Sequence, residues 1–314
     1  MPRPLTIVMY HYVRNPSETP YRGLKARTVT EFRAQLRHIA AEYTPVTMEQ
    51  VIQAIHQPDY SLPERPILLT FDDGYIDHYE TVFPLLAERG WQGAFFPPAR
   101  PIVEGRLLDV NKLHFVLAST TDTTAIVGAI FNAVDGFRAE FGLDEGRAYW
   151  NRVAVADRFD SADVIFVKRM LQRELPETLR AMLLTKLFRE LVATSEVEFA
   201  RRLYMSVEQL QKMARAGMFI GSHGSEHYWM DRLTPEDQAS EIDASMKFLD
   251  SLGCRTDAWV MCYPYGAWNM SLLDALRQRK CAAALTVEVA VADLDVNDPL
   301  TLPRLDTNDL PVTG

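Results

Sequence analysis

Short apolar runs that recur along the 314-residue chain constrain its fold more than any other feature. Each run is rich in aliphatic or β-branched residues and ends in polar ones. The runs lie at 5–12, 66–73, 93–97, 218–223, 258–263, 282–287 and 300–305. Helical patterns separate several of them, at 30–41, 79–89 and 235–252. Because buried parallel strands alternate with helices in this way, the sequence predicts an α/β fold with a parallel sheet or barrel.

The region from about 104 to 203 lacks these apolar runs. Leucines repeat there at helical spacing, at Leu179, Leu183, Leu187 and Leu191. We therefore predict a single domain over residues 1–314 that carries a helical insertion at about 104–203. Acidic and basic residues roughly balance in the insertion, so we expect it to form a cap or the contact surface of a homo-oligomer.

The composition argues against several classes of protein. The formal net charge of -9 disfavours nucleic acid as a partner, because phosphate binding relies on a surplus of Lys and Arg. The three cysteines show no CxxC spacing, which argues against a disulfide framework. No stretch approaches the roughly 20 apolar residues of a membrane helix, and the first apolar run is too short for a signal peptide. We therefore expect no membrane span and a cytoplasmic location.

Two polar segments at the ends of predicted strands contain groups that bind metal ions. Asp72 and Asp73 end one apolar run, and His223 and His227 lie at the end of another. One carboxylate and two imidazoles form the three-ligand set of catalytic divalent metal sites, and the second carboxylate can act as a base on water. Catalytic groups gather at the carboxyl face of parallel barrels. We therefore interpret these residues as a hydrolytic metal site and not as ordinary turn residues.

A third segment, Tyr263–Gly266, ends another predicted strand, and with it the chain resembles a known family. The segments Thr70–Gly74, Ser222–His227 and Tyr263–Gly266, in this order, resemble the motifs of the polysaccharide deacetylase family with the NodB-homology domain, carbohydrate esterase family 4. The resemblance covers both flanks of the insertion but not the insertion itself. It implies a distorted (β/α) barrel of about seven parallel strands and a metal-dependent enzyme that removes acetyl groups from sugars.

The resemblance also assigns roles to individual residues. Asp72 corresponds to the general base, and Tyr265 to the residue whose backbone N–H helps to hold the oxyanion. The metal ligands implied by the motifs are Asp73, His223 and His227, and we expect the divalent ion to be Zn²⁺. Such an ion lowers the pKa of bound water toward about 7, so that a nearby carboxylate can complete its activation.

Two positions depart from the family pattern. Cys262 stands where the family has an arginine that tethers the base, and Arg304, at the end of the final predicted strand, is our candidate for its replacement. No histidine follows His227, although the family has a late histidine that protonates the leaving amine. We assign this role to His11, because the chain resembles the permuted branch of poly-N-acetylglucosamine deacetylases, in which the acid lies near the N-terminus. We assign no role to His38, His56, His78 and His114.

These assignments predict hydrolysis of an N-acetyl group of an amino sugar, with an acetylated sugar as the partner. Because no export signal is evident and the insertion could roof the barrel mouth, we expect a small intracellular precursor of a surface polysaccharide, nucleotide- or lipid-linked. Two alternatives stay open at this stage. One is an amidohydrolase or deacylase that acts on a non-carbohydrate amide, since the motifs specify chemistry better than substrate. The other is a catalytically inactive sugar-binding protein, which the cysteine at position 262 favours.

Overall fold

The structure, a computed structural model, describes residues 3–157 and 160–312. The chain divides into two compact units. The first unit contains residues 1–15, 26–106 and 200–314, and the second contains residues 16–25 and 107–199. All three motif segments belong to the first unit. The second unit takes most of the predicted insertion and also residues 16–25, which no sequence pattern linked to it.

Parallel pairing joins five strands of the first unit in one row. β1 (Pro4–Tyr10) lies between β3 (Pro66–Asp72) and β9 (Leu305–Asp306) and pairs in parallel with both. β3 pairs in parallel with β4 (Ala94–Phe96), and β4 pairs in parallel with β5 (Phe219–Ile220). The carboxyl ends of these strands therefore lie at the same edge.

Two further strands close this row into a ring. The remaining strands are β6 (Val260–Cys262), β7 (Ala283–Leu285), β2 (Thr44–Pro45) and β8 (Ala292–Asp293). β6 and β7 pair in parallel. A bridge between Ser222 and Met261 joins β6 to the end of β5, and a bridge between Leu285 and Leu302 joins β7 to the segment before β9. The ring of β1, β3, β4, β5, β6, β7 and β9 confirms the predicted distorted (β/α) barrel.

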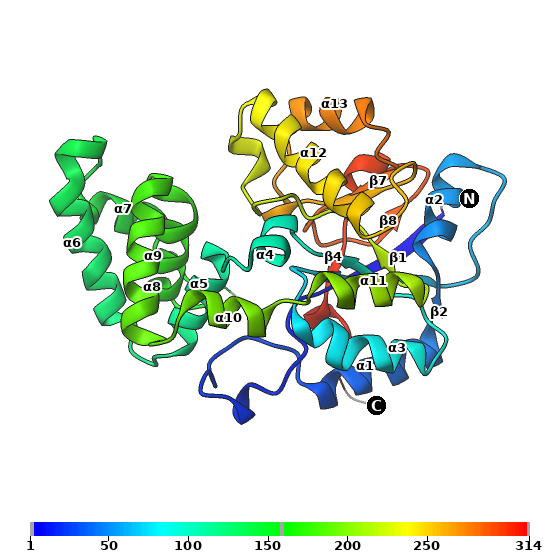
Figure 1. The fold of residues 1–314 in the computed structure, drawn as a ribbon, viewed down its shortest axis with the longest axis horizontal. Helices are drawn as coiled ribbons and strands as arrows, with labels where there is room; N and C mark the ends of the chain where they lie inside the picture. Colours follow the sequence, from blue (N-terminus) through cyan, green and yellow to red (C-terminus); the bar gives the residue numbers. More distant parts are fainter. Residues whose placement is uncertain (1–2, 158–159, 313–314) are drawn as a thin grey trace. The chain divides into compact units, whose positions relative to one another are not determined.

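Helices surround the barrel of the first unit, with α12 and α13 on one side of the strands and α1 and α3 on the other (Figure 1). Their bounds are α1 Val29–Glu42, α2 Met48–His56, α3 Phe83–Ala87, α4 Ala99–Glu104, α11 Val207–Arg215, α12 Pro235–Ser251 and α13 Met270–Gln278. The helix predicted at 79–89 begins instead as a π-helical segment, η2 (His78–Val82), which leads into α3. α10 (Glu196–Leu203) contains residues of both units.

Side chains of β3 alternate between the two faces of the strand. Three of them, Ile67, Leu69 and Phe71, belong to a core cluster that also contains helix residues. Leu68 belongs to a second cluster with Leu5 of β1 and Val260 of β6, on the interior side of the barrel. Because Thr70 and Asp72 share the face of Leu68, Asp72 is directed into the carboxyl end of the barrel.

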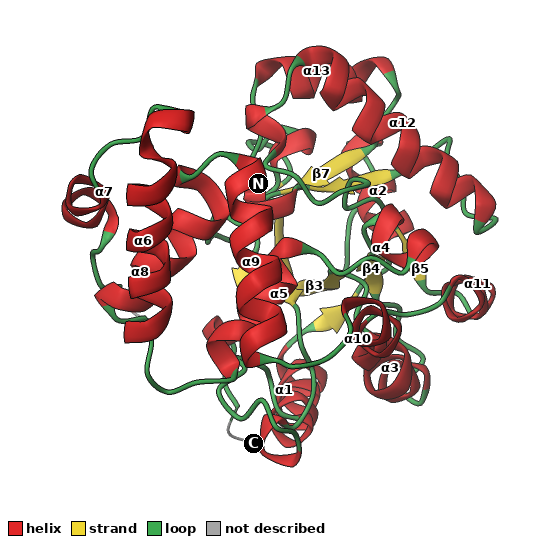
Figure 2. Cartoon of the chain, turned by 60° about the vertical axis from the view of Figure 1, so that its left-hand side comes forward, coloured by secondary structure: helices red, strands yellow, loops and turns green. Residues whose placement is uncertain are grey.

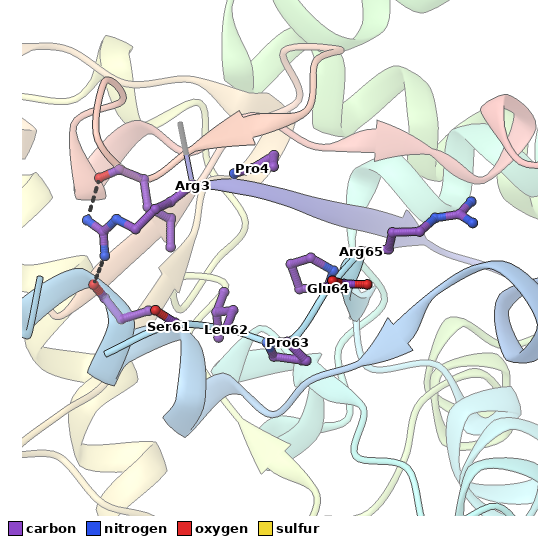
Figure 3. A pocket seen from close by; sticks show the side chains of 10 residues that line it. Arg3, Pro4, Ser61, Leu62, Pro63, Glu64 and Arg65 are labelled. Atoms are coloured by element: carbon purple, nitrogen blue, oxygen red, sulfur yellow. Dashed lines mark hydrogen bonds between the residues drawn. The ribbon is translucent and has the colours of Figure 1, made fainter. Parts of the chain in front are cut away.

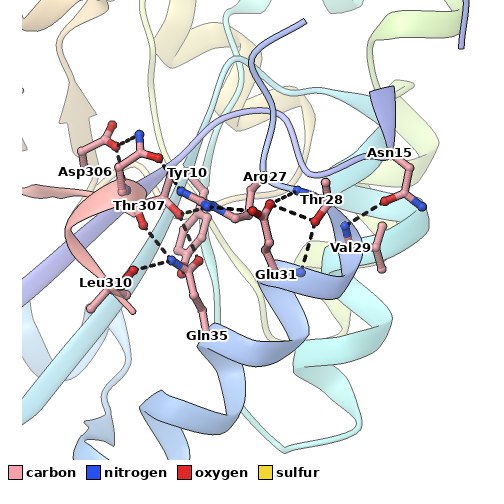
Figure 4. A network of polar contacts seen from close by, with 11 residues as sticks. Tyr10, Asn15, Arg27, Thr28, Val29, Glu31, Gln35, Asp306, Thr307 and Leu310 are labelled. Atoms are coloured by element: carbon pink, nitrogen blue, oxygen red, sulfur yellow. Dashed lines mark hydrogen bonds and ion pairs between the residues drawn. The ribbon is translucent and has the colours of Figure 1, made fainter. Parts of the chain in front are cut away.

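α1 belongs to a network of polar contacts that anchors the end of β1 (Figure 4). α1 begins with a capping box, in which Thr28 accepts the N–H of Glu31 and the Glu31 carboxylate accepts the N–H of Thr28. Further along α1, the buried Gln35 accepts the hydroxyl of Tyr10 at 3.1 Å and donates to the carbonyl of Thr307 at 2.7 Å. The position that follows Tyr10 is thereby fixed relative to the C-terminal segment.

The last predicted strand differs from the structure. The apolar run at 300–305 was expected to be continuous, but a 3₁₀ turn occupies Pro299–Thr301 and β9 begins only at Leu305. Pro303 lies between them and has no N–H to contribute to a strand ladder. The chain therefore reaches the barrel through the single bridge at Leu302 and pairs as a strand only beyond Arg304.

The described residues of the second unit form helices, turns and loops (Figure 2). The helical segments are η1 Pro16–Glu18, α5 Asp109–Ala118, α6 Thr124–Phe141, α7 Gly146–Val153, α8 Ala162–Arg169, η3 Met170–Glu174 and α9 Glu177–Leu191. α9 buries Leu179, Leu183 and Leu187 of the predicted leucine stripe, whereas Leu191 at its end is 37% exposed. Across the described parts of both units, no helix has the length and apolar character needed to cross a membrane.

Candidate active site

Asp72 and Asp73 lie at the carboxyl end of β3, and their side chains point toward different partners. Both are almost completely buried, with 2% and 3% of their surface exposed. Asp72 is the last residue of the strand. Asp73 and Gly74 follow with φ values of 73° and 68°, a left-handed turn that is uncommon for a residue other than glycine. Because the chain turns here, the two adjacent carboxylates do not compete for the same contacts.

Arg304 holds the carboxylate of Asp72 inside the barrel. The guanidinium is fully buried and donates from Nη1 to Oδ1 at 3.0 Å and from Nη2 to Oδ2 at 2.8 Å, which is a bidentate pair. It also donates to the hydroxyl of Thr70 at 3.1 Å and to the carbonyl of Thr286 at 2.7 Å. Burial would raise the pKa of Asp72, but the charges of Arg304 and His223 outweigh it and lower the pKa to about 2. Asp72 is therefore an oriented, ionised carboxylate.

Cys262, at the end of β6, lies beside this pair. Its Sγ is within 4.8 Å of potential ligand atoms of Asp72 and His223, and the side chain is completely buried. A small thiol thus occupies the position where the resemblance placed an arginine. The cation reaches Asp72 from the segment that leads into β9 instead.

Three potential metal ligands converge on the other side of the turn. Oδ1 of Asp73 lies 3.3 Å from Nε2 of His223 and 3.2 Å from Nε2 of His227. Nδ1 of His223 is 2.7 Å from the carbonyl of Cys262, which can only accept, so Nδ1 carries a proton and Nε2 is the ring nitrogen directed at Asp73. The hydroxyl of Tyr75 donates to Oδ2 of Asp73 at 2.5 Å, which leaves Oδ1 directed at the imidazoles.

This donor set fits a divalent metal ion. Oδ1 of Asp73 is buried without a hydrogen-bond partner, and such atoms are rare unless a water or an ion satisfies them. Nε2 of both imidazoles faces this oxygen, so one cation bound between the three atoms would contact all of them. One carboxylate and two histidines are a ligand set of catalytic zinc sites. Asp73, His223 and His227 could therefore hold the ion, because one potential ligand atom of each lies within 4.8 Å of the other two.

The loop at 223–227, which carries both histidines, is held by its backbone groups. Glu241 of α12 is 8% exposed, and its Oε2 accepts the N–H groups of Ser225 and Glu226, each at 2.9 Å. The first two residues of α4 donate their N–H groups to two carbonyls of the same loop. His227 has a φ of 60°, and these contacts keep it in this conformation. Burial raises the pKa of Glu241 to about 7.

Tyr265 and His11 lie at the same end of the barrel. Tyr265, with a φ of 58°, packs its ring edge-on against His227 at 4.7 Å and stacks on Trp229 at 4.3 Å. His11 directly follows β1 and is partly buried. Burial opposes the ionisation of Asp72 and Asp73, yet the pKa of each is lowered, and the charge of His11 is among the causes. The structure thus brings together all seven residues to which the sequence assigned roles.

Three residues around this centre had no role in the sequence analysis, namely Tyr75, His78 and Glu241. Tyr75 contacts Asp73, and Glu241 contacts the histidine loop from another helix. His78 contacts the carbonyl of His11, which is 67 residues away in the chain. No local sequence pattern could have identified His78 or Glu241, because their partners are distant in sequence.

A separate hollow lies at the opposite end of the barrel strands (Figure 3). Its volume is about 410 Å³, and it is lined by residues at the starts of β1 and β3 and by the segment that precedes β3. The guanidinium of Arg3 in its wall already donates to Asp295 at 2.7 Å and to the carbonyl of Ala54 at 2.6 Å. The hollow is therefore distinct from the site at the carboxyl ends.

Comparisons with known proteins agree with this geometry. The sequence profile of the family described as polysaccharide deacetylase matches residues 59–112 and 192–284, which include all three motif segments. YxkH of Bacillus subtilis (strain 168), whose name places it provisionally among polysaccharide deacetylases, is 30% identical over 92 residues, which are 29% of this chain and 33% of that protein. The poly-β-1,6-N-acetyl-D-glucosamine N-deacetylase of Escherichia coli (strain K12) is 42% identical over 55 residues, which are 18% of this chain and 8% of that protein.

A solved structure shares the fold along the whole chain. The deacetylase PplD of Streptococcus pyogenes, solved in complex with acetate, matches with a TM-score of 0.61 at 16% identity and covers 99% of this chain and 94% of its own. The alignments with the two curated relatives span a third of their length or less. The matched family profile lies on both flanks of the helical region and contains each motif that forms the site. Residues 59–112 and 192–284 of the chain are thus similar to the polysaccharide deacetylase family.

Proposed function

We propose that this chain is a metal-dependent deacetylase that hydrolyses the N-acetyl group of an amino sugar. The observation that carries the proposal is the convergence of Asp73, His223 and His227 next to the ionised Asp72 at the carboxyl end of the barrel. A divalent ion, for which we propose Zn²⁺, supplies Lewis-acid chemistry when bound, because it lowers the pKa of water and polarises a carbonyl group.

Asp72 acts as the general base in this proposal. Arg304 occupies one lone pair on each of its oxygens and fixes the plane of the carboxylate. Each oxygen has a second lone pair, which can accept the proton of the attacking water. The backbone N–H of Tyr265 is proposed to donate to the acetyl oxygen as that oxygen gains negative charge.

His11 acts as the general acid. An amine is a poor leaving group until its nitrogen is protonated, so amide hydrolysis needs a donor on the side of the leaving group. The charge of His11 acts on Asp72 and Asp73, which supports its place in the same centre. Asp72 then takes a proton from the attacking water, and the imidazolium of His11 gives a proton to the leaving nitrogen.

The substrate is proposed to contain N-acetylglucosamine. The similarity to the Escherichia coli protein, which is named for deacetylation of poly-β-1,6-N-acetyl-D-glucosamine, supports this sugar. The stacked rings of Trp229 and Tyr265 beside His227 also support it, because they offer an apolar face on which a sugar ring can lie. Their planes differ by 3°, so the two rings lie face to face and a sugar ring would pack on an outer face of the pair. We also propose that the sugar is a small nucleotide- or lipid-linked precursor, and the assay below tests this form directly.

The test measures acetate release by protein that has been stripped of metal and then reloaded with Zn²⁺. The substrate panel contains nucleotide-linked N-acetylglucosamine, β-1,6-linked N-acetylglucosamine oligomers, chitin oligomers and a simple non-carbohydrate acetamide. We expect turnover of a sugar substrate by the reloaded protein only. Release from the acetamide alone, or from nothing, would refute the function. Release from oligomers without turnover of the nucleotide-linked sugar would refute the precursor form and leave the deacetylase intact.

A further inference from the structure

Two residues hold the segment that follows β1: Asp77, just before η2, and His78, the first residue of η2. Nε2 of His78 lies 2.8 Å from the carbonyl oxygen of His11. Oδ2 of Asp77 accepts the N–H of Val13 at 3.2 Å. Asp77 also pairs with the guanidinium of Arg14, from Nε to Oδ2 at 2.7 Å and from Nη2 to Oδ1 at 2.6 Å. The backbone on which His11 stands is thus tied at its carbonyl and again two residues later.

His78 acts here as a neutral hydrogen-bond donor. It is completely buried, and burial lowers its pKa despite the hydrogen bond to His11. A carbonyl can only accept, so Nε2 carries the proton. Nδ1 is buried without a hydrogen-bond partner in the described part of the chain, which is costly for a polar atom. An apolar ring at this position would avoid that cost but could not donate to the carbonyl of His11. The hydrogen bond to His11 is therefore what a histidine provides here.

Aromatic neighbours fix the orientation of the His78 ring. Phe71, Tyr75 and Phe95 surround it with centroid distances of 5.6, 5.7 and 5.8 Å. The π-helical geometry of η2 begins at this residue. Short π-helical segments occur often at functional sites, because they change the direction of side chains within a helix. His78 is therefore a rigid contact for the backbone of His11.

We propose that His78 is a positioning residue for His11. Its hydrogen bond fixes the carbonyl of His11 and thereby the direction in which the His11 side chain leaves the end of β1. The inference rests on the proposed function, in which His11 protonates the leaving amine. Asp77 supports the same segment through Val13 and Arg14.

The test compares two acetyl substrates that differ in their need for an acid. The amine of an N-acetyl sugar leaves only with a proton, whereas the 4-nitrophenolate of 4-nitrophenyl acetate leaves without one. His78→Leu removes the donor and keeps an apolar side chain in the space. We expect His78→Leu to lower kcat for the amide about 10- to 100-fold, because a displaced catalytic group loses rate steeply with distance. Hydrolysis of the aryl ester and the Zn²⁺ content should stay at the wild-type level.

Matched variants separate positioning from folding. The side-chain nitrogen of glutamine can occupy the place of Nε2, whereas that of asparagine reaches only the place of Nδ1. His78→Gln should therefore recover most of the rate on the amide substrate, and His78→Asn should not. If His78→Leu does not fold, the glutamine and asparagine pair carries the test. Equal loss on both substrates, loss of bound Zn²⁺, or no loss on the amide in folded protein would each overturn the inference.

A parallel His11→Ala variant distinguishes the two levels of the argument. It should show the same selective loss on the amide, and the pH dependence of kcat for the amide should lose the limb that reports the acid. If His11→Ala loses activity on the amide alone while His78→Leu keeps the wild-type rates, the positioning role is refuted and the role of His11 stands. A His11→Ala variant without selectivity refutes the role of His11 and, with it, the positioning role. A wild-type protein that hydrolyses neither substrate refutes the proposed function itself.

Discussion

The Asp72 side and the Asp73 side of the site begin at adjacent residues and are equally buried, yet their carboxylates meet different partners. Both oxygens of Asp72 accept hydrogen bonds from the guanidinium of Arg304. Asp73 accepts one hydrogen bond at Oδ2, from Tyr75, and directs Oδ1 at the imidazoles of His223 and His227. One side therefore contains a guanidinium, and the other contains two imidazoles.

This difference shows how one short motif supports two kinds of chemistry. A buried carboxylate is tolerated only where a cation or hydrogen-bond donors compensate for the lost water. Asp72 finds its cation within the chain, so it stays oriented and ionised. Asp73 faces two imidazoles instead of a guanidinium, and its Oδ1 together with their Nε2 atoms fits a metal ion.

The largest expected effect lies on the Asp73 side. Combining Asp73→Ala with His227→Ala removes two of the three proposed ligands, so the protein should lose its bound metal and its turnover should fall to background. Elemental analysis of the purified variant measures the metal, and acetate release measures turnover. Asp72→Asn is the matched control, because it changes the neighbouring carboxylate and should keep the metal. An unchanged metal content in the double variant would show that the ligands lie elsewhere.

A smaller effect is expected on the Asp72 side. Asp72→Asn keeps the size of the side chain but removes its capacity to take a proton, so turnover should fall roughly 10²- to 10⁴-fold while one metal ion per chain is retained. Steady-state acetate release, together with elemental analysis of the same preparation, checks both parts. Near-normal turnover would mean that another group acts as the base.

The smallest expected effect is the contribution of Asp72 to stability at acid pH. Its pKa is lowered from 3.8 to about 2 in the folded chain, so the unfolded chain takes up the proton first as the pH falls. The stabilisation is therefore complete above about pH 4 and is lost as the pH falls toward 2. It amounts to roughly 2 kcal/mol at 1.36 kcal/mol per pKa unit. Urea unfolding of metal-free protein at neutral pH and near pH 2 measures it, and Asp72→Asn should lack this part of the pH dependence. A parallel response of wild type and variant would contradict the low pKa.

Local patterns predicted most of the barrel. The runs that became β1 and β3 are continuous; β3 ends at Asp72, and His11 directly follows β1. The helix predicted at 235–252 is α12, and Thr234 caps it by accepting the N–H of Asp237, as the sequence indicated. These features depend on neighbours within a few residues, so the sequence alone predicts them.

Local patterns failed where the chain departs from regular geometry. The run at 300–305 has the apolar composition of a strand, but the 3₁₀ turn and Pro303 shorten it to β9. The helical pattern at 79–89 cannot distinguish a π-helical start from an α-helical one, because the hydrogen bonds of the two differ in span by only one residue. In η2 that difference accompanies the contacts of Asp77 and His78 with the segment after β1.

The sequence by itself determined which chemical groups stand at the ends of the strands, because strand ends and turns follow from short-range patterns. It named Asp72, Asp73, His223 and His227 without reference to any distant contact. Only the tertiary structure decided which of these groups meet which partners. Arg304 reaches Asp72 across 232 residues because the closure of the barrel places the segment before β9 beside β1 and β7. Such pairings depend on strand order and register around the ring, and no local pattern of residues encodes these.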